Sequence, residues 1–334
     1  MATKRIEKWD NLKFFLILFV VVGHFCEYFI GNNAVARDIF VFIYSFHMPL
    51  FIFVSGLFSK KNIDEKRYEK MFSFVIVFFL INILLFVSKS FFLKGFNFSA
   101  DIFNMAGVPW YAFAIFAFSL ITVFLKKFSP LFVLTSSIIL ACFAGYNQNI
   151  STFLSLSRII VYYPFFYLGY FLREEDIIKF VSKKYIKILS VVIIIALGIV
   201  VFNVPNIHFL TPLLTSSGSY FEFLDNVQFG GLCRLAYYAI VPIICVAVIS
   251  LVPEKIPTGM IAKFGSRSLQ VYILHYPIIY ILTSEKLNIL FFRKDYEHPV
   301  FTIFVAGIVL TLILSLKVFS EPILKIINPK KRKD

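Results

Sequence analysis

Cysteine is scarce in this chain, and the few cysteines follow no recognisable pattern. They are Cys26, Cys142, Cys233 and Cys245, and each falls inside or beside an apolar segment. Their separations do not match the spacing of a metal site. We therefore expect buried reduced thiols, with neither a disulfide framework nor a metal centre.

The sequence also lacks a soluble domain, an internal repeat and a low-complexity tract. Its N-terminus is basic at Lys4, Arg5 and Lys8 and then apolar, which superficially looks like a signal peptide. No small-residue cleavage site follows, and the apolar run is long enough to span a membrane, so we interpret it as an uncleaved first helix. Residues 1–334 are expected to form one membrane domain, whose basic cytoplasmic tail over 321–334 also contacts anionic lipid.

Hydrophobic residues, by contrast, make up 59% of the chain, and the mean hydropathy is +0.83. Soluble domains are about 45–50% apolar, so this composition indicates an all-α, polytopic membrane helix bundle. Apolar windows of about 17–25 residues predict about ten transmembrane helices. They lie near residues 12–30, 39–58, 71–93, 109–126, 130–146, 157–172, 186–203, 231–252, 268–284 and 299–320.

The net charge of +14 does not indicate a nucleic-acid partner, because the basic residues lie in short loops and tails. Lys and Arg are concentrated at the N-terminus and in every second connection after it, and they are sparse in the alternate connections. The positive-inside rule then predicts that both termini are cytoplasmic.

His24 lies deep inside the first apolar run, where an ionisable side chain is costly and indicates function. Lys13 precedes it by 11 residues and Asp10 by 14. At about 100° per residue, these offsets return to within about 20° and 40° of the same direction. The three residues should therefore form one polar stripe that runs from the membrane edge to its interior. The alternative is a structural histidine satisfied by a neighbouring helix.

Two further histidines lie in predicted spans. His47 precedes Pro49 in FHMPLFIFVSG, at a depth similar to that of His24. It could line a cavity with His24, or it could cap carbonyl groups that Pro49 leaves free. His275 lies in the ninth span, in SLQVYILHYPIIY.

The outer face has its own candidates. Arg158 stands at the mouth of the sixth span and is followed by Tyr162 and Tyr163. Such an arginine could snorkel to the interface or could contact a sugar or a carboxylate. The predicted outer loop over 204–230 contains Glu222 and Asp225 without Lys or Arg, and it could be a binding loop or a plain solvated connection.

Five segments in the same order resemble the acyltransferase-3 family of integral-membrane acyltransferases. They are KWDNLKFFLILFVVVGHF, FHMPLFIFVSGLF, VPWYAFAIF (which contains Trp110), SRIIVYYPFFYLGYFL and SLQVYILHYP. The resemblance spans about residues 9–284 and is closest to fucose 4-O-acetylase-like and polysaccharide O-acetyltransferases. It implies a multi-pass protein of the plasma membrane, in bacteria.

The resemblance also implies roles for individual residues. His24 matches the histidine taken as catalytic, Asp10 matches the acidic residue at the start of that helix, and Lys13 stands where most members have Arg. Arg67 and Lys70 occupy the place of a basic pair that is Arg-x-x-Arg in many members. Their cytoplasmic loop could bind an anion or simply be solvated.

The implied reaction moves an acyl group from acyl-CoA, most often acetyl-CoA, to a hydroxyl of a cell-envelope or exported polysaccharide sugar. The glycan that accepts the group could be lipid-linked. No bound cofactor is implied. Imidazole titrates near neutral pH, so His24 suits a general base, although a covalent acyl-histidine is also possible.

We expect Lys13, Arg67 and Lys70 to hold the donor's phosphates at the inner face, about 16 Å from His24 along the helix. The acceptor side and cavity are expected to comprise His47, Trp110, Arg158, Tyr162, Tyr163, Glu222, Asp225 and His275. The competing functions are a transporter or flippase, which should show repeated halves, and a membrane sensor without chemistry.

Overall fold

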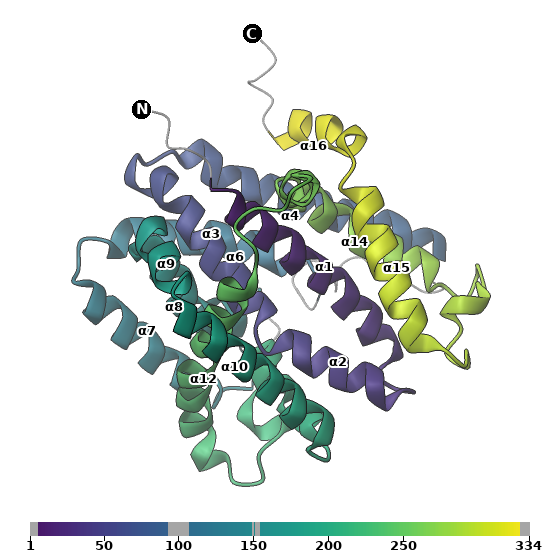
Figure 1. Ribbon diagram of the computed structural model, residues 1–334, viewed down its shortest axis with the longest axis horizontal. Helices are drawn as coiled ribbons and strands as arrows, with labels where there is room; N and C mark the ends of the chain where they lie inside the picture. The colour runs from purple at the N-terminus through teal and green to yellow at the C-terminus, as the bar shows by residue number, and fades with distance from the viewer. Residues whose placement is uncertain (1–5, 93–106, 149, 151–153, 328–334) are drawn as a thin grey trace.

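The computed structural model describes residues 6–92, 107–148, 150 and 154–327, which fold as helices joined by short connections (Figure 1). The longer helices are α1 (Glu7–Phe29), α3 (His47–Asp64), α4 (Tyr68–Phe92), α6 (Trp110–Leu125), α7 (Pro130–Ala144), α8 (Leu156–Phe171), α10 (Lys184–Asn203), α12 (Gly230–Leu251), α14 (Ser268–Leu282) and α15 (Pro299–Leu314). The shorter elements are α2 (Ala34–Tyr44), α9 (Glu174–Val181), α11 (Thr211–Thr215), α13 (Met260–Gly265), α16 (Ser320–Ile327), η1 (Ile207–Leu210), η2 (Tyr220–Glu222), η3 (Val227–Phe229), η4 (Leu290–Phe292) and η5 (Lys317–Phe319).

Every predicted span falls on one or two helices, and these helices differ in length. Five are long and apolar enough to cross a membrane: Glu7–Phe29, Ala34–Asp64, Tyr68–Phe92, Lys184–Asn203 and Val227–Leu251. A sixth exists if Pro299–Leu314 and Lys317–Ile327, which are bent by 62°, form one span. The long helices confirm an all-helical multi-pass bundle. Because α6, α7 and α14 are apolar but shorter, the ten crossings stay a prediction.

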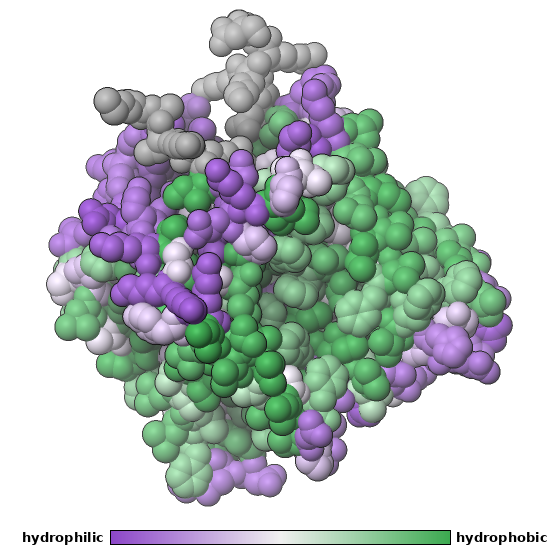
Figure 2. All heavy atoms as spheres, viewed as in Figure 1, coloured by the Kyte–Doolittle hydropathy of each residue, from purple (hydrophilic) through white to green (hydrophobic). Residues whose placement is uncertain are grey.

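Lipid-compatible surface covers much of the molecule. Figure 2 shows a broad hydrophobic area, with hydrophilic residues gathered toward its edges. On α10, the side chains Ile188, Val192, Ile195 and Ile199 are all more than half exposed. They recur at helical spacing on one face, as expected of a helix that packs on the protein by one side and faces lipid by the other.

Helix α1 is held at its start by buried polar residues. The Lys8 ammonium donates a 2.6 Å hydrogen bond to the Val252 carbonyl, and the Asn11 amide donates to the Pro253 carbonyl at 3.1 Å. Both carbonyls lie at the end of α12, where no further helical N–H can reach them. These bonds fix α1 against the bundle, so the depth of every residue along α1 is defined.

The second predicted span is two helices, because the chain is interrupted at Ser45 and Phe46 between α2 and α3. Pro49 lies in the first turn of α3, where its missing N–H costs little. The predicted span over 39–58 is thus confirmed within Ala34–Asp64, with this interruption inside it. The interruption places His47 at the first position of α3.

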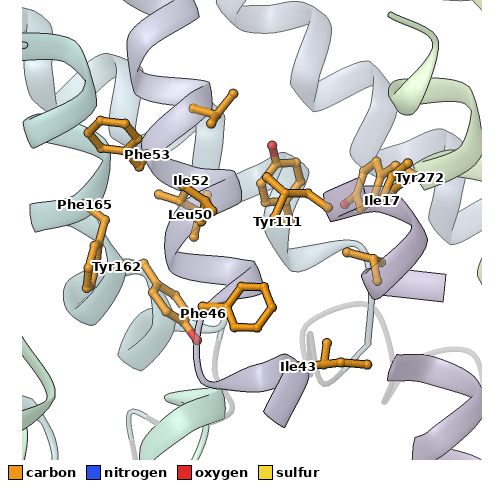
Figure 3. Packing of buried hydrophobic residues seen from close by; sticks show 14 of the residues in the cluster. Ile17, Ile43, Phe46, Leu50, Ile52, Phe53, Tyr111, Tyr162, Phe165 and Tyr272 are labelled. Atoms are coloured by element: carbon orange, nitrogen blue, oxygen red, sulfur yellow. The ribbon is translucent and has the colours of Figure 1, made fainter. Parts of the chain in front are cut away.

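Helices α3 and α8 are in direct backbone contact. A Cβ added to Gly56 would overlap the carbonyl of Phe166, and one added to Gly169 would overlap the carbonyl of Phe53. Only glycine allows two helices to approach so closely. The core beside this contact contains Leu50, Phe53 and Phe165, which Figure 3 shows together with side chains of α1, α6 and α14.

The segment between α10 and α12 is folded, not a plain solvated connection. Tyr220 is fully buried, and its hydroxyl donates to the Cys142 carbonyl at 2.9 Å. The buried Arg234 donates to the Leu213 carbonyl at 3.0 Å and to the Ser216 hydroxyl at 3.2 Å. These bonds pack η2 onto α7 and α11 onto α12.

Candidate active site

His24 on α1 borders two cavities. The first, which we name the large cavity, measures about 720 Å³ and lies toward the Phe29 end of α1. The second, which we name the small cavity, measures about 30 Å³ and lies toward the Lys13 end. The large cavity is lined by His24, Glu27, Tyr28, Phe92, Tyr276, Ile279, Tyr280, Thr283, Ser284, Glu285 and Lys286. The small cavity is lined by Ile17, Val20, His24, Met48, Phe51, Val108, Trp110, Tyr111 and Tyr272.

The imidazole of His24 is held by a carboxylate one turn further along α1. Its Nδ1 lies 2.9 Å from Oε2 of Glu27, which itself lines the large cavity. An ionised carboxylate only accepts hydrogen bonds, so Nδ1 carries the proton and Nε2 keeps its lone pair. This is the tautomer that a general base requires. A hydroxyl that reaches Nε2 can therefore lose its proton to His24.

A second imidazole, from α14, faces the first. The ring centre of His275 is 5.3 Å from that of His24, and the ring of Tyr276 is 4.7 Å from it. Nδ1 of the fully buried His275 donates to the carbonyls of Val271 and Tyr272, each at 2.9 Å. Its Nε2 is buried and has no partner among the residues that the structure describes. The ring that carries this unpartnered nitrogen therefore packs beside the ring of His24.

His47 is at once a cap and a neighbour of the site. Its Nδ1 donates to the Ile43 carbonyl at 2.8 Å, across the interruption between α2 and α3. Its ring lies 4.4 Å from the ring of Tyr44, and its charge is coupled electrostatically to that of His24. His47 lines neither of the two cavities that His24 borders, so the structure supports the capping interpretation.

Arg158 is anchored within the protein beside this cluster. Its guanidinium lies 5.1 Å from the ring of Trp110, and its Nε donates to the Thr215 carbonyl at 3.3 Å. Trp110 stacks in turn on Tyr162, with ring centres 5.5 Å apart. Arg158 also interacts electrostatically with Glu27. The structure therefore brings Arg158, Trp110 and Tyr162 together next to His24.

Tyr163 and the acidic residues of the 204–229 segment lie apart from both cavities. The Tyr163 hydroxyl is 3.3 Å from the Thr122 hydroxyl, and its ring packs on Phe118. Glu222 accepts a 2.8 Å hydrogen bond from the backbone N–H of Ser219 and caps η2. Asp225 is exposed. None of these three predicted residues lines either cavity, and neither do His47, Arg158, Tyr162 and His275.

Lys13 lies at the basic end of the stripe formed by Asp10, Lys13 and His24. Lys13 pairs with the buried Asp10 at 2.7 Å and lies 4.7 Å from the ring of Phe58. Arg67 is ion-paired with Glu65, and Lys70 is exposed. Ile17 and Val20, which line the small cavity, continue the face of α1 that joins Lys13 to His24.

Glu174 on α9 adds a carboxylate near Lys13. The two side chains interact electrostatically. Burial, reinforced by the negative charge of Glu175, raises the pKa of the Glu174 carboxyl. The surroundings of Lys13 are therefore mixed in charge.

Comparison with known proteins identifies the family. The model of an acyltransferase domain of the acyltransferase-3 type matches residues 6–319, which include every residue of this site. The chain belongs to the acyltransferase-3 family. Over 191 residues it is 26% identical to the nodulation protein NolL of Mesorhizobium japonicum. That match covers 52% of the chain and 49% of NolL, so the chain spans about half the length of this curated relative. No solved structure matches this chain.

For an acyltransferase-3 protein, the geometry adds residues that the sequence patterns did not single out. Glu27 could have been found from its position, because residues three apart share a helix face. Tyr276 directly follows His275 within SLQVYILHYP, and Tyr111 follows Trp110 within VPWYAFAIF. The chain is thus a multi-pass membrane acyltransferase whose helices bring His24 and its carboxylate partner Glu27 to the border of two cavities.

Proposed function

We propose that the protein is an O-acetyltransferase that moves an acetyl group from acetyl-CoA to a hydroxyl of a cell-envelope or exported glycan. The observation that carries the proposal is His24, poised by Glu27 and bordered by one cavity on each side. Two cavities that meet at one base suit a reaction between two substrates that arrive separately.

The distribution of Lys and Arg supports an orientation for the two substrates. It favours about ten crossings with a cytoplasmic N-terminus, so that the Lys13 end of α1 faces the cytoplasm and the large cavity opens outward. A cysteine engineered at Ser217 should then react with an impermeant maleimide from outside intact cells. Labelling from the cytoplasmic side alone would refute this orientation.

Acetyl-CoA is made in the cytoplasm and is anionic at its nucleotide end. We assign its phosphates to Lys13, Arg67 and Lys70, with Asp10 orienting Lys13 through their 2.7 Å ion pair. The pantetheine arm would then run along the face of α1 that carries Ile17 and Val20. The distance to His24 is about 16 Å at 1.5 Å per residue.

The large cavity is our candidate for the acceptor. It combines carboxylates at Glu27 and Glu285 with the tyrosines Tyr28, Tyr276 and Tyr280, and sugars need both hydrogen-bonding groups and flat aromatic surfaces. Its volume of about 720 Å³ lies in the range of small-molecule sites.

A neighbouring surface cavity of about 200 Å³ extends the acceptor path. It shares Tyr28 and Glu285 with the large cavity and continues to Arg293 and Lys294. A glycan longer than one sugar could lie along both. Arg158, Tyr162 and Trp110 would support the site from the far side of His24, whereas Tyr163 and Glu222 gain no support from their positions.

The reaction needs one proton carrier. His24 Nε2 takes the proton of the acceptor hydroxyl while the oxygen attacks the thioester carbonyl carbon. The carbon–sulfur bond breaks, and the imidazolium returns the proton to the CoA thiolate. The Glu27 carboxylate stabilises the imidazolium in between, through the hydrogen bond to Nδ1.

The test combines a cell and a purified protein. Mass spectrometry of envelope glycans should show loss of acetyl esters in a deletion strain, restored by the wild-type gene but not by His24→Ala. The purified protein should release CoA from acetyl-CoA when extracted glycan is added. Acetylation by a correctly inserted His24→Ala protein would reject the proposal.

A further inference from the structure

The small cavity has the size of one short acyl group. It measures about 30 Å³, whereas a cavity needs roughly 10–15 Å³ to hold one water molecule. Apart from His24, its lining consists of apolar and aromatic side chains. A methyl group is therefore a better occupant of it than a polar group.

The tyrosine hydroxyls of this lining are already engaged. The Tyr272 hydroxyl donates to the Val108 carbonyl at 2.7 Å and accepts from the Ala112 N–H at 3.1 Å. The Tyr111 hydroxyl lies 2.6 Å from the Ser55 hydroxyl. Both rings thus present their apolar faces, and Figure 3 shows them near Ile17.

The same bonds make the wall stiff. Tyr111 packs edge-on against Tyr272 and Phe51, with ring centres 5.1 Å and 5.5 Å apart. Moving either ring would break a hydrogen bond as well as this packing. The cavity therefore cannot expand cheaply to receive a longer chain.

We propose that the small cavity holds the acyl group of the donor beside His24 and restricts it to acetyl, with Met48 and Phe51 as the specificity-determining residues. The inference rests on the proposed function and adds the donor's acyl length to it. Met48 and Phe51 lie one turn apart on α3, both line the cavity, and both are partly buried. Val20, four residues before His24, forms the opposite side on α1.

The test measures acyl-chain preference with the purified full-length protein. Binding of acetyl-CoA, propionyl-CoA and butyryl-CoA is measured by calorimetry, and thiol release with water as acceptor is measured in parallel. One extra methylene changes the preference of an apolar pocket by roughly 10–200-fold. Wild-type protein should therefore bind butyryl-CoA at least about tenfold more weakly than acetyl-CoA.

Truncation should remove this discrimination. In Met48→Ala or Phe51→Ala, butyryl-CoA should bind about as tightly as acetyl-CoA, while Val20→Leu should weaken acetyl-CoA about tenfold. Met260→Ala and Phe301→Ala remove the same side chains at sites that are 52% and 65% exposed, and they should keep the wild-type preference.

The outcomes separate the two proposals. Equal binding of all three donors by wild-type protein, or unchanged preference in both truncation variants, would overturn the acyl-length assignment while leaving the acyltransferase function standing. Wild-type protein that neither binds nor cleaves any acyl-CoA would overturn both.

Discussion

His24 and His275 are 251 positions apart in the sequence, yet the centres of their imidazole rings lie only 5.3 Å from each other. Nδ1 of His24 is engaged by the Glu27 carboxylate, and Nδ1 of His275 is engaged by backbone carbonyls. Both rings consequently keep a lone pair on Nε2. When His24 takes up a proton, a neutral and polarisable neighbour is already in place.

Replacing His275 should slow catalysis without weakening donor binding. Because the unpartnered Nε2 of His275 can stabilise a protonated His24, His275→Phe should lower kcat about tenfold and leave KM for acetyl-CoA unchanged. His275→Gln, which retains an acceptor, should recover part of kcat. A rise in KM with unchanged kcat would contradict this role and indicate a packing function instead.

Glu27→Gln should reduce kcat about a hundredfold, because the amide cannot stabilise the imidazolium as a carboxylate does. Steady-state kinetics with acetyl-CoA and extracted glycan would measure it. Glu285→Gln is the matched control in the same cavity, and it should alter KM for the acceptor more than kcat. Equal effects of the two substitutions on kcat would argue against a special role for Glu27.

Lys13→Ala should raise the donor KM about tenfold, as expected for the loss of one charge-assisted contact of about 1.5 kcal/mol. Lys13→Arg keeps the charge with a different geometry and should be tolerated better. Lowering the salt concentration should partly rescue binding through the remaining cations. If alanine at Lys13, Arg67 and Lys70 together left donor KM unchanged, the CoA nucleotide would have to bind elsewhere.

Glu174→Gln should lower the donor KM by about two- to fivefold. Its carboxylate interacts with Lys13 and would repel the donor's phosphates, an effect of roughly 0.2–1 kcal/mol for a partly exposed charge. The raised pKa of Glu174 gives the sign of the pH effect. As pH falls through this pKa, the carboxylate is neutralised and the wild-type donor KM should fall as well. Donor KM that responds to pH equally in Glu174→Gln would exclude this explanation.

Gly56→Ala should destabilise the protein by about 1–3 kcal/mol, because its Cβ would overlap the Phe166 carbonyl and push α3 away from α8. Thermal unfolding in detergent measures the difference. Gly198→Ala is the control, since a Cβ there meets nothing within 4 Å and replaces glycine in the middle of α10. It should be neutral or stabilising by up to about 1 kcal/mol. Equal melting temperatures for both variants would count against the close contact.

Sequence patterns predicted the helices because apolar length alone marks a membrane segment. They also predicted the stripe of Asp10, Lys13 and His24, because helical periodicity fixes which residues share a face. They did not reveal the interruption at Ser45 and Phe46 between α2 and α3, which the His47 imidazole bridges by its hydrogen bond to the Ile43 carbonyl.

Other features depend on contacts between distant segments, which periodicity does not encode. The sequence could not tell that Trp110, Arg158 and Tyr162 stack on one another, or that Tyr272 braces the start of α6. The sequence did not reveal that Glu222 caps its own turn. A glutamate that bonds to nearby backbone and a glutamate that binds a ligand are the same residue in a sequence. On α14, the sequence singled out His275, whereas the lining of the large cavity by Tyr276 and Tyr280 comes from the tertiary structure.

Among the described residues, the large and small cavities have a single lining residue in common, His24. A protein that draws one reactant from each side of a membrane risks an ion leak whenever both compartments connect through it. In the proposed two-sided arrangement, the His24 imidazole would stand between the donor side and the acceptor side, so the separation of the two sides and the chemistry of transfer would depend on one side chain. Removing that ring would join the two cavities as well as take away the proposed base.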